Sequence, residues 1–124
     1  MAEPVVLLYD PGETLSIPHL PALCAVRRLK LREVEDSLLD APVGELAAGK
    51  TEVSPSTGGP LPEPVLIFCN LSGPQLDWML VGLRKQRCTC LKAILTPDNS
   101  LWTFRALYQE LCREREAMTT TRRS

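Results

Sequence analysis

Apolar residues form two short continuous runs, Val5–Tyr9 and Val65–Cys69, and both runs are rich in residues that favour β-strands. Continuous runs of this length are typical of strands buried on both faces of a sheet. A second strand is predicted after each run, at Leu31–Val34 and at Cys90–Leu95. The segment Leu31–Val34 is more polar than the others, so we expect it at an edge of the sheet.

Apolar residues recur at helical spacing after each predicted strand. The first helix is expected to begin late, near His19 or Leu20, because Pro21 would be costly beyond a first turn. A short helix is predicted at Val43–Ala48, and Gly49 provides its C-terminal stop.

The start of the third helix is the clearest local signal in the chain. Ser72 is the expected N-cap, and Gln75 three residues later completes a capping box. Leu71 and Leu76 flank this cap as a hydrophobic staple.

The last helix is predicted to begin with Thr96 as its cap and Pro97 at its first position. Its apolar stripe runs through Leu101, Phe104, Leu107, Tyr108 and Leu111.

This order of strands and helices predicts an α/β fold made of two βαβα halves. The halves should form one small, mostly parallel four-stranded sheet with flanking helices, and the favoured strand order is 2-1-3-4. We expect a single domain over residues 1–118, with halves at 1–49 and 65–118. Residues 50–64 hold four prolines and a glycine pair and are expected to be a loop or linker with little to pack. A disordered tail is expected at 119–124.

The two halves resemble each other when the sequence is shifted by about sixty positions. An old internal duplication would explain this match, but any two βαβα units share similar spacing, and both explanations stay open. The shift superposes Val5 on Val65, Leu20 on Leu80, Leu23 on Leu83 and Leu31 on Leu91.

A ligand site is expected where the two central strands end, because crevices at the carboxyl ends of parallel strands commonly hold ligands. The helix start after Asn70 could also hold an anion, although a glycine-rich phosphate motif is missing and Pro74 removes one donor. The candidate ligand-binding residues are Asp10, Gly12, Thr14, Asn70, Ser72 and Gly73.

The sequence gives little support for catalysis or for a metal site. The single histidine, His19, has no evident catalytic partner. The pair Cys88 and Cys90 should lie roughly 20 Å from Cys69, at the other end of a parallel sheet, so these thiols cannot share one metal ion. We therefore expect no metal, no cofactor and no catalytic residues. Three cysteines are interpreted as small apolar core residues, namely Cys24, Cys69 and Cys112.

The composition of the chain limits the classes of partner that it is expected to bind. The 14 Lys and Arg residues nearly balance the 15 Asp and Glu residues, and only 5% of residues are aromatic, which disfavours nucleic acid. The N-terminus resembles neither a signal peptide nor a membrane span, and the odd number of cysteines fits a reducing compartment. We expect a cytoplasmic protein without a membrane partner. Trp78 and Trp102 lie beside the apolar stripes of their helices. Each could widen the buried face of its helix, or either could belong to an exposed patch for self-association as a homodimer.

A set of residues in the second half forms a recognisable pattern: Leu91, Lys92, Ala93, Thr96, Pro97, Trp102, Thr103, Leu107, Tyr108, Glu110 and Leu111. With these residues, the segment from Pro64 to Met118 resembles a bacterial domain family of unknown function. The resemblance implies a bacterial cytoplasmic protein and implies no activity, substrate or cofactor. Three hypotheses follow from the sequence: a non-enzymatic interaction or regulatory module that self-associates, a protein that binds a small ligand or anion in the crevice, and a thiol redox enzyme, which would require an exposed cysteine of low pKa.

Overall fold

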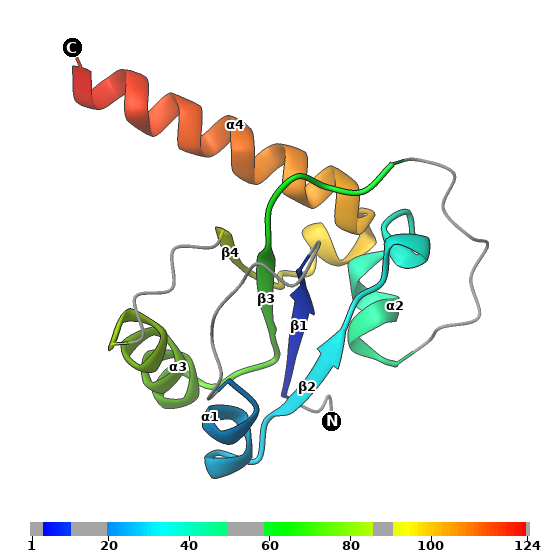
Figure 1. The fold of residues 1–124 in the computed structure, drawn as a ribbon, viewed down its shortest axis with the longest axis vertical. Helices are drawn as coiled ribbons and strands as arrows, with labels where there is room; N and C mark the ends of the chain where they lie inside the picture. The colour runs from blue at the N-terminus through cyan, green and yellow to red at the C-terminus, as the bar shows by residue number, and fades with distance from the viewer. Residues whose placement is uncertain (1–3, 11–19, 50–58, 86–90, 124) are drawn as a thin grey trace.

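The computed structural model describes residues 4–10, 20–49, 59–85 and 91–123. Within these ranges a twisted sheet lies between two pairs of helices (Figure 1). The elements are β1 (Val5–Tyr9), α1 (Leu20–Val26), β2 (Lys30–Glu33), η2 (Asp36–Leu38), α2 (Val43–Ala47), β3 (Val65–Cys69), α3 (Gly73–Lys85), β4 (Leu91–Ile94), η3 (Asn99–Leu101) and α4 (Phe104–Arg123), where η denotes a 3-10 helix.

The strand order is β2-β1-β3-β4, which confirms the predicted order and places the two most apolar strands at the centre. β1 pairs with β2 in parallel, and β3 pairs with β4 in parallel. The central pair is antiparallel, with Val5 opposite Cys69 and Tyr9 opposite Val65. The sheet is therefore mixed, with two parallel pairs around one antiparallel pair.

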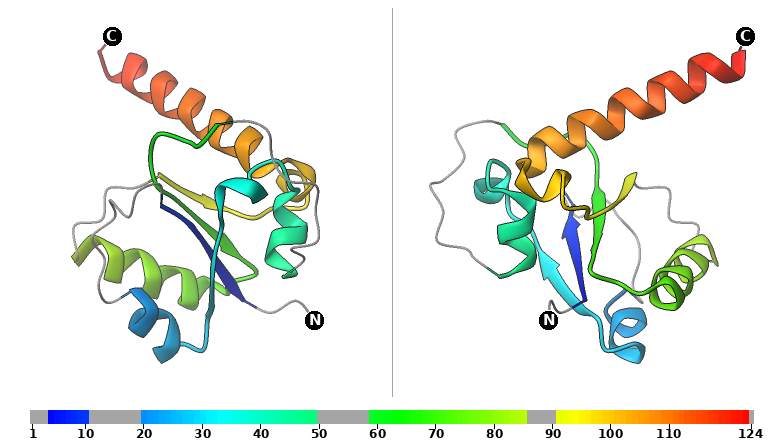
Figure 2. Two further views of the ribbon diagram at one scale, coloured as in Figure 1. Left: turned by 45° about the vertical axis from the view of Figure 1, so that its right-hand side comes forward. Right: turned by 180° about the vertical axis from the view of Figure 1, so that it is seen from behind.

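The reversal of β3 follows from the placement of the crossover helices. α1 and α3 pack on the same face of the sheet and bury Leu20, Cys24, Met79 and Leu83 there (Figure 2). Crossover connections are nearly always right-handed. Two right-handed crossovers that leave adjacent parallel strands in opposite directions would put their helices on opposite faces. Helices on one face therefore require the second half to run the other way. α2 and α4 cover the opposite face.

Contacts between the halves are reciprocal. Leu7 lies opposite Ile67, which is its counterpart at an offset of sixty positions. Farther out, the Val43 N–H donates to the Trp102 carbonyl (2.9 Å), and the Phe104 N–H donates to the Ala41 carbonyl (3.1 Å). At an offset of 61 positions, Val43 is the counterpart of Phe104, and Ala41 is the counterpart of Trp102. Each half therefore donates and accepts the same hydrogen bond. These are the contacts of an approximate two-fold axis.

The predicted superposition of Leu31 on Leu91 is wrong by one residue. Val5 pairs with Lys30 and Val65 pairs with Leu91, so Lys30 is the counterpart of Leu91. From β2 and β4 onward, the offset between the halves is therefore 61 positions.

The predicted end of α2 and the predicted start of α3 are confirmed. α2 is followed by Gly49 at a φ of 85°, in the left-handed region that favours glycine. The start of α1 stays a prediction, because residues 11–19 lie outside the described residues. At α3 the Gln75 N–H donates to Ser72 Oγ (3.3 Å), and the Ser72 N–H donates to Gln75 Oε1 (2.8 Å). The capping box therefore forms as predicted.

The predicted start of the last helix is wrong. Thr96 does cap a helical turn, but the turn is the short η3 rather than α4. The Thr96 N–H donates to Asn99 Oδ1 (2.8 Å), and the Asn99 N–H donates to Thr96 Oγ1 (3.1 Å). This reciprocal pair closes the turn locally, so Pro97 precedes a 3-10 helix and does not begin α4.

α4 begins at Phe104 instead, and Thr103 is its cap, because Thr103 Oγ1 accepts the Ala106 N–H at 3.0 Å. The helix then continues through residues 119–123, where the sequence predicted a disordered tail. Extending an existing helix adds a hydrogen bond for each residue and carries no nucleation cost.

The interpretation of residues 50–64 as a linker with little to pack is wrong for the described part. Leu61 is buried, and its N–H donates to the Tyr9 hydroxyl at 3.0 Å. The Tyr9 hydroxyl in turn donates to Asp36 Oδ1 at 2.6 Å. Burial and this hydrogen bond to Asp36 raise the pKa of Tyr9. Residues 50–58 lie outside the described residues.

Glu63 attaches the same segment to α4. Arg115 binds both carboxylate oxygens of Glu63, at 2.7 and 3.1 Å, and the Tyr108 hydroxyl donates to Glu63 at 3.2 Å. The Arg115 guanidinium lowers the pKa of Glu63. The segment that leads into β3 is therefore held by the end of β1 through Leu61 and by α4 through Glu63.

Candidate functional site

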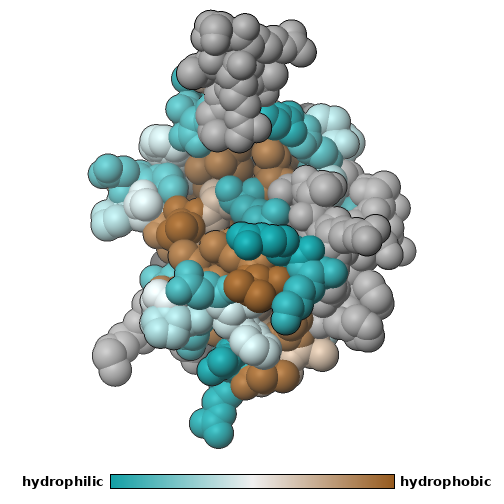
Figure 3. All heavy atoms as spheres, turned by 90° about the vertical axis from the view of Figure 1, so that its left-hand side faces the viewer, coloured by the Kyte–Doolittle hydropathy of each residue, from teal (hydrophilic) through white to brown (hydrophobic). Residues whose placement is uncertain are grey.

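An open hollow of about 550 Å³ runs along the outer edge of β4, between α3 and α4. We call this hollow the β4 groove. Figure 3 shows apolar surface gathered on this side of the molecule, with polar residues around it. The groove is lined by Phe68, Leu76, Leu80, Lys92, Ala93, Ile94, Thr96, Asp98, Asn99, Trp102, Leu107, Glu110, Leu111 and Glu114.

The β4 groove reaches both faces of the sheet because β4 is an edge strand. Leu76 and Leu80 of α3 line one side, and Leu107 and Leu111 of α4 line the other. Two further apolar residues of the lining are strongly exposed: Ile94 at 52% and Trp102 at 41%. Both would be covered if a partner occupied the groove.

The backbone of β4 takes part in this surface. The Leu95 N–H donates to the Phe68 carbonyl at 2.9 Å, so it points toward β3. Because successive residues of a strand face opposite neighbours, the N–H of Ile94 points away from β3 into the groove. The Ile94 carbonyl accepts from the Asn99 side-chain amide at 3.0 Å. The outer edge of β4 thus presents the Ile94 N–H as a backbone donor, whereas the Ile94 carbonyl is already hydrogen-bonded to Asn99.

Acidic side chains dominate the charge of the groove. Among the lining residues that the structure describes, Asp98, Glu110 and Glu114 stand against one basic residue, Lys92. Glu110 Oε2 is 3.0 Å from the largely exposed Arg113, and exposed ion pairs of this kind hold their partners weakly. The rim of the groove is therefore negative.

The sequence interpretation missed most of this site, although two signals pointed to it. The predicted strand order already made β4 an edge strand, and alternation along it sets Ile94 opposite in direction to Ala93. Glu110 and Glu114 are spaced one helical turn apart beside Leu107 and Leu111, which indicates a charged border along an apolar stripe.

The expected crevice at the carboxyl ends of the two central strands does not form. Asp10 follows Tyr9, which pairs with the first residue of β3, whereas Asn70 follows Cys69, which pairs with the first residue of β1. The two loops therefore lie at opposite ends of the sheet, because β1 and β3 are antiparallel. The prediction of one shared ligand site is wrong. Gly12 and Thr14 lie outside the described residues.

The helix start at Ser72 and Gly73 uses its own donors. The N–H groups of Ser72 and Gln75 are both engaged in the capping box, and Pro74 has no N–H. Few backbone donors are left for an anion at this end of α3, so the arrangement favours a structural cap.

Replacing Ser72 by alanine should lower the free energy of unfolding by about 1 kcal/mol, because the substitution removes the acceptor for the Gln75 N–H. Urea denaturation followed by circular dichroism measures the change. Ser72→Thr keeps the hydroxyl and should stay close to the parent protein. An unchanged midpoint for Ser72→Ala would contradict a structural cap.

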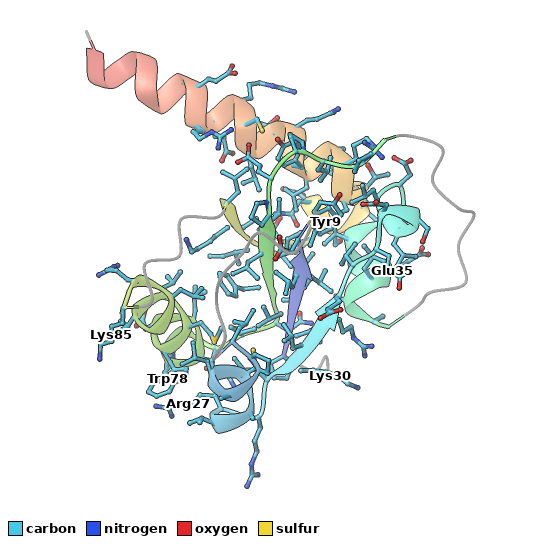
Figure 4. The ribbon with its side chains drawn as sticks, viewed as in Figure 1. Tyr9, Arg27, Lys30, Glu35, Trp78 and Lys85 are labelled. Atoms are coloured by element: carbon cyan, nitrogen blue, oxygen red, sulfur yellow. The ribbon has the colours of Figure 1, made fainter. Side chains whose placement is uncertain are left out.

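Trp78 and Trp102, the two expected interaction residues, lie in different places. Trp78 is half-buried at the contact between α3 and α1, where its Nε1 donates to the Leu23 carbonyl at 3.4 Å. The guanidinium carbon of Arg27 lies 4.5 Å from the centre of the Trp78 ring (Figure 4). Trp78 thus joins two helices, and only Trp102 of the pair lines the β4 groove.

Cysteine chemistry is limited among the described residues, which hold no cluster of His, Cys, Asp and Glu suited to a metal ion. Cys24 and Cys69 are buried, as predicted, and burial raises their pKa values to about 11 and about 12. Cys112 is half-buried against the core. His19 and the pair at positions 88 and 90 lie outside the described residues.

Iodoacetamide should leave Cys24 and Cys69 unmodified in the native protein at mildly alkaline pH, because alkylation requires an accessible thiolate. Both should react after denaturation. Peptide mapping by mass spectrometry distinguishes these sites from the other cysteines. Modification of either residue at the same rate in native and denatured protein would contradict this prediction.

The fold thus defines a mixed α/β protein with an open groove at one sheet edge. Residues 64–118, which form the second half, match the model of a family described as Domain of unknown function (DUF3783). No curated protein and no solved structure matches the chain. Among the described residues, no helix combines the length and apolar character needed to cross a bilayer.

Proposed function

We propose that the protein is a non-enzymatic interaction module that binds an extended, positively charged segment of a partner protein along β4. The observation that carries the proposal is the β4 groove, which combines an open strand edge, exposed apolar side chains and an acidic rim.

An extended segment suits the shape of the groove. A strand added beside β4 would place alternate side chains on opposite faces of the sheet. One set would reach Leu76 and Leu80 of α3, and the other set would reach Leu107 and Leu111 of α4. The N–H of Ile94 would donate to the backbone of the added strand. A single extended chain could therefore make the apolar contacts on both faces and the backbone hydrogen bond at the same time.

The charge of the rim favours a basic partner over a second copy of this chain. Two-fold pairing of β4 with β4 of another copy would bring Asp98, Glu110 and Glu114 of both copies into one interface. Like charges in an interface are unfavourable. Self-association, which the two tryptophans suggested, is therefore the competing occupant that an experiment must distinguish.

The test starts from random peptides about ten residues long, enough to span a short strand. They are selected by display on the full chain, then synthesised, and their affinities are measured by fluorescence polarisation. We expect the selected peptides to be basic. Ile94→Lys should weaken binding at least about tenfold, because it places a charged group on the apolar edge. Val26→Lys changes another exposed apolar residue, on α1 and outside the groove lining, and should bind like the parent.

Three outcomes would overturn the proposal. One is that no peptide is selected, and another is that Ile94→Lys and Val26→Lys bind the peptides equally. The third is a dimer in sedimentation velocity that Ile94→Lys dissociates, because that result would assign the groove to a second copy.

A further inference from the structure

The two edges of the sheet carry related hollows. A smaller hollow of about 270 Å³ lies along β2, and its lining includes Arg32, Leu46 and Gly49. At the offset of 61 positions, these three residues correspond to Ala93, Leu107 and Glu110, which all line the β4 groove. The approximate two-fold axis therefore relates the hollow at β2 to the groove at β4.

Arg32 forms part of the wall of the hollow at β2. It pairs with Leu7 in the sheet register, so its side chain lies on the face covered by α2 and α4. The guanidinium rests against Gly49 so closely that a Cβ atom there would lie 2.8 Å from one terminal nitrogen. The Nε atom of Arg32 is buried. An arginine side chain of this chain thus lies along the edge of the first half, from β2 to Gly49.

Among the described residues, no side chain fills the corresponding place at β4, and the charge there is opposite. Ala93 stands where Arg32 stands at β2, and it pairs with Ile67 on the same face of the sheet. Glu110 stands at the position of Gly49, and Glu114 follows one turn later on α4. Leu107 and Leu111 supply an apolar wall suited to the methylene groups of a long side chain.

We propose that the β4 groove takes an arginine side chain of the bound segment over Ala93, with its guanidinium against the carboxylates of Glu110 and Glu114. This inference rests on the proposed function and adds the residue that the groove selects. The planar guanidinium holds its N–H donors in a rigid fork that matches the two oxygens of a carboxylate, whereas an ammonium group is a compact charge with no such fork. Arg32 at β2 is the internal model for how such a side chain lies along this fold.

The first test uses L-argininamide as the probe, with citrulline amide as its uncharged match. Amide chemical shifts of the full chain are followed in a titration. Argininamide should shift the signals of Ala93, Glu110 and Leu111 in a saturable way, and citrulline amide should not. Equal shifts with both compounds would overturn the inference.

The second test uses the peptides selected in the display experiment. Replacing their arginine by citrulline should weaken binding roughly tenfold to a hundredfold, the loss expected for a charge-assisted hydrogen bond. Glu110→Gln should reduce the affinity of the arginine peptide and leave that of the citrulline peptide unchanged. Glu116→Gln is the matched control, because Glu116 is exposed on the same helix outside the groove lining.

The two proposals fail in different ways. If no peptide binds the groove, the proposed function is wrong. If peptides bind along β4 but tolerate citrulline, or respond equally to Glu110→Gln and Glu116→Gln, the interaction module stands and the arginine selectivity is wrong.

Discussion

Phe104→Ala is expected to lower the free energy of unfolding by about 3–5 kcal/mol, the range for removing a fully buried aromatic ring. Phe104 is inaccessible to solvent, and its ring centre lies 5.9 Å from that of Tyr9. It also begins α4 and hydrogen-bonds to Ala41 of the other half. The substitution therefore opens a cavity where the two halves meet.

Urea denaturation measures the free energy of unfolding of Phe104→Ala, and Trp102→Ala is the matched control. Trp102 is close in sequence but exposed, so its truncation should change the free energy of unfolding by less than about 0.5 kcal/mol. A loss for Phe104→Ala as small as that expected for Trp102→Ala would show that α4 does not contribute its first residue to the core. Phe104→Leu, which keeps most of the volume, should fall between them.

Tyr9→Phe should cost about 2 kcal/mol of unfolding free energy, although it removes a single oxygen atom. The Tyr9 O–H donates to Asp36, and its oxygen accepts from the buried N–H of Leu61. Without it, the Leu61 N–H loses its partner, and leaving a buried donor unsatisfied costs about 1–3 kcal/mol.

Tyr108→Phe is the matched control for this second prediction. The Tyr108 hydroxyl donates to Glu63, a partly exposed carboxylate that Arg115 also binds. Its loss should therefore cost less than that of the Tyr9 hydroxyl. Equal midpoints for the two variants in urea would contradict the role given to Tyr9. Hydrogen exchange at Leu61 should accelerate in Tyr9→Phe alone.

The sequence predicted those parts of the fold that depend on neighbouring residues. The apolar runs at β1 and β3 and the capping box at Ser72 are decided within a few positions, and the structure confirms them. The start of α4 was misplaced because Thr96 and Pro97 satisfy the local rules for a helix start. Asn99 accepts the Thr96 N–H and turns that start into a separate 3-10 helix.

The direction of β3 could not be predicted from the strand pattern. An apolar run is the same in both directions, and the reversal depends on α1 and α3 sharing one face. The expected site at Asp10 and Asn70 failed with that direction, because strand ends meet only when the strands are parallel. Of the predicted site residues that the structure describes, Trp102 is the one that lines the β4 groove. The origin of the two halves by duplication stays a prediction.

A chain built from one βαβα half alone would have to cover the inner edge of its first strand. Residues 64–118, which the family model matches, are such a half. The register that sets Leu7 opposite Ile67 would set Ile67 opposite its own copy in an isologous dimer. That dimer would carry an acidic, alanine-lined groove at each end and would be bivalent. The single chain has Arg32 at one end, so on the proposed function it would offer one such groove and would bind a target without cross-linking it.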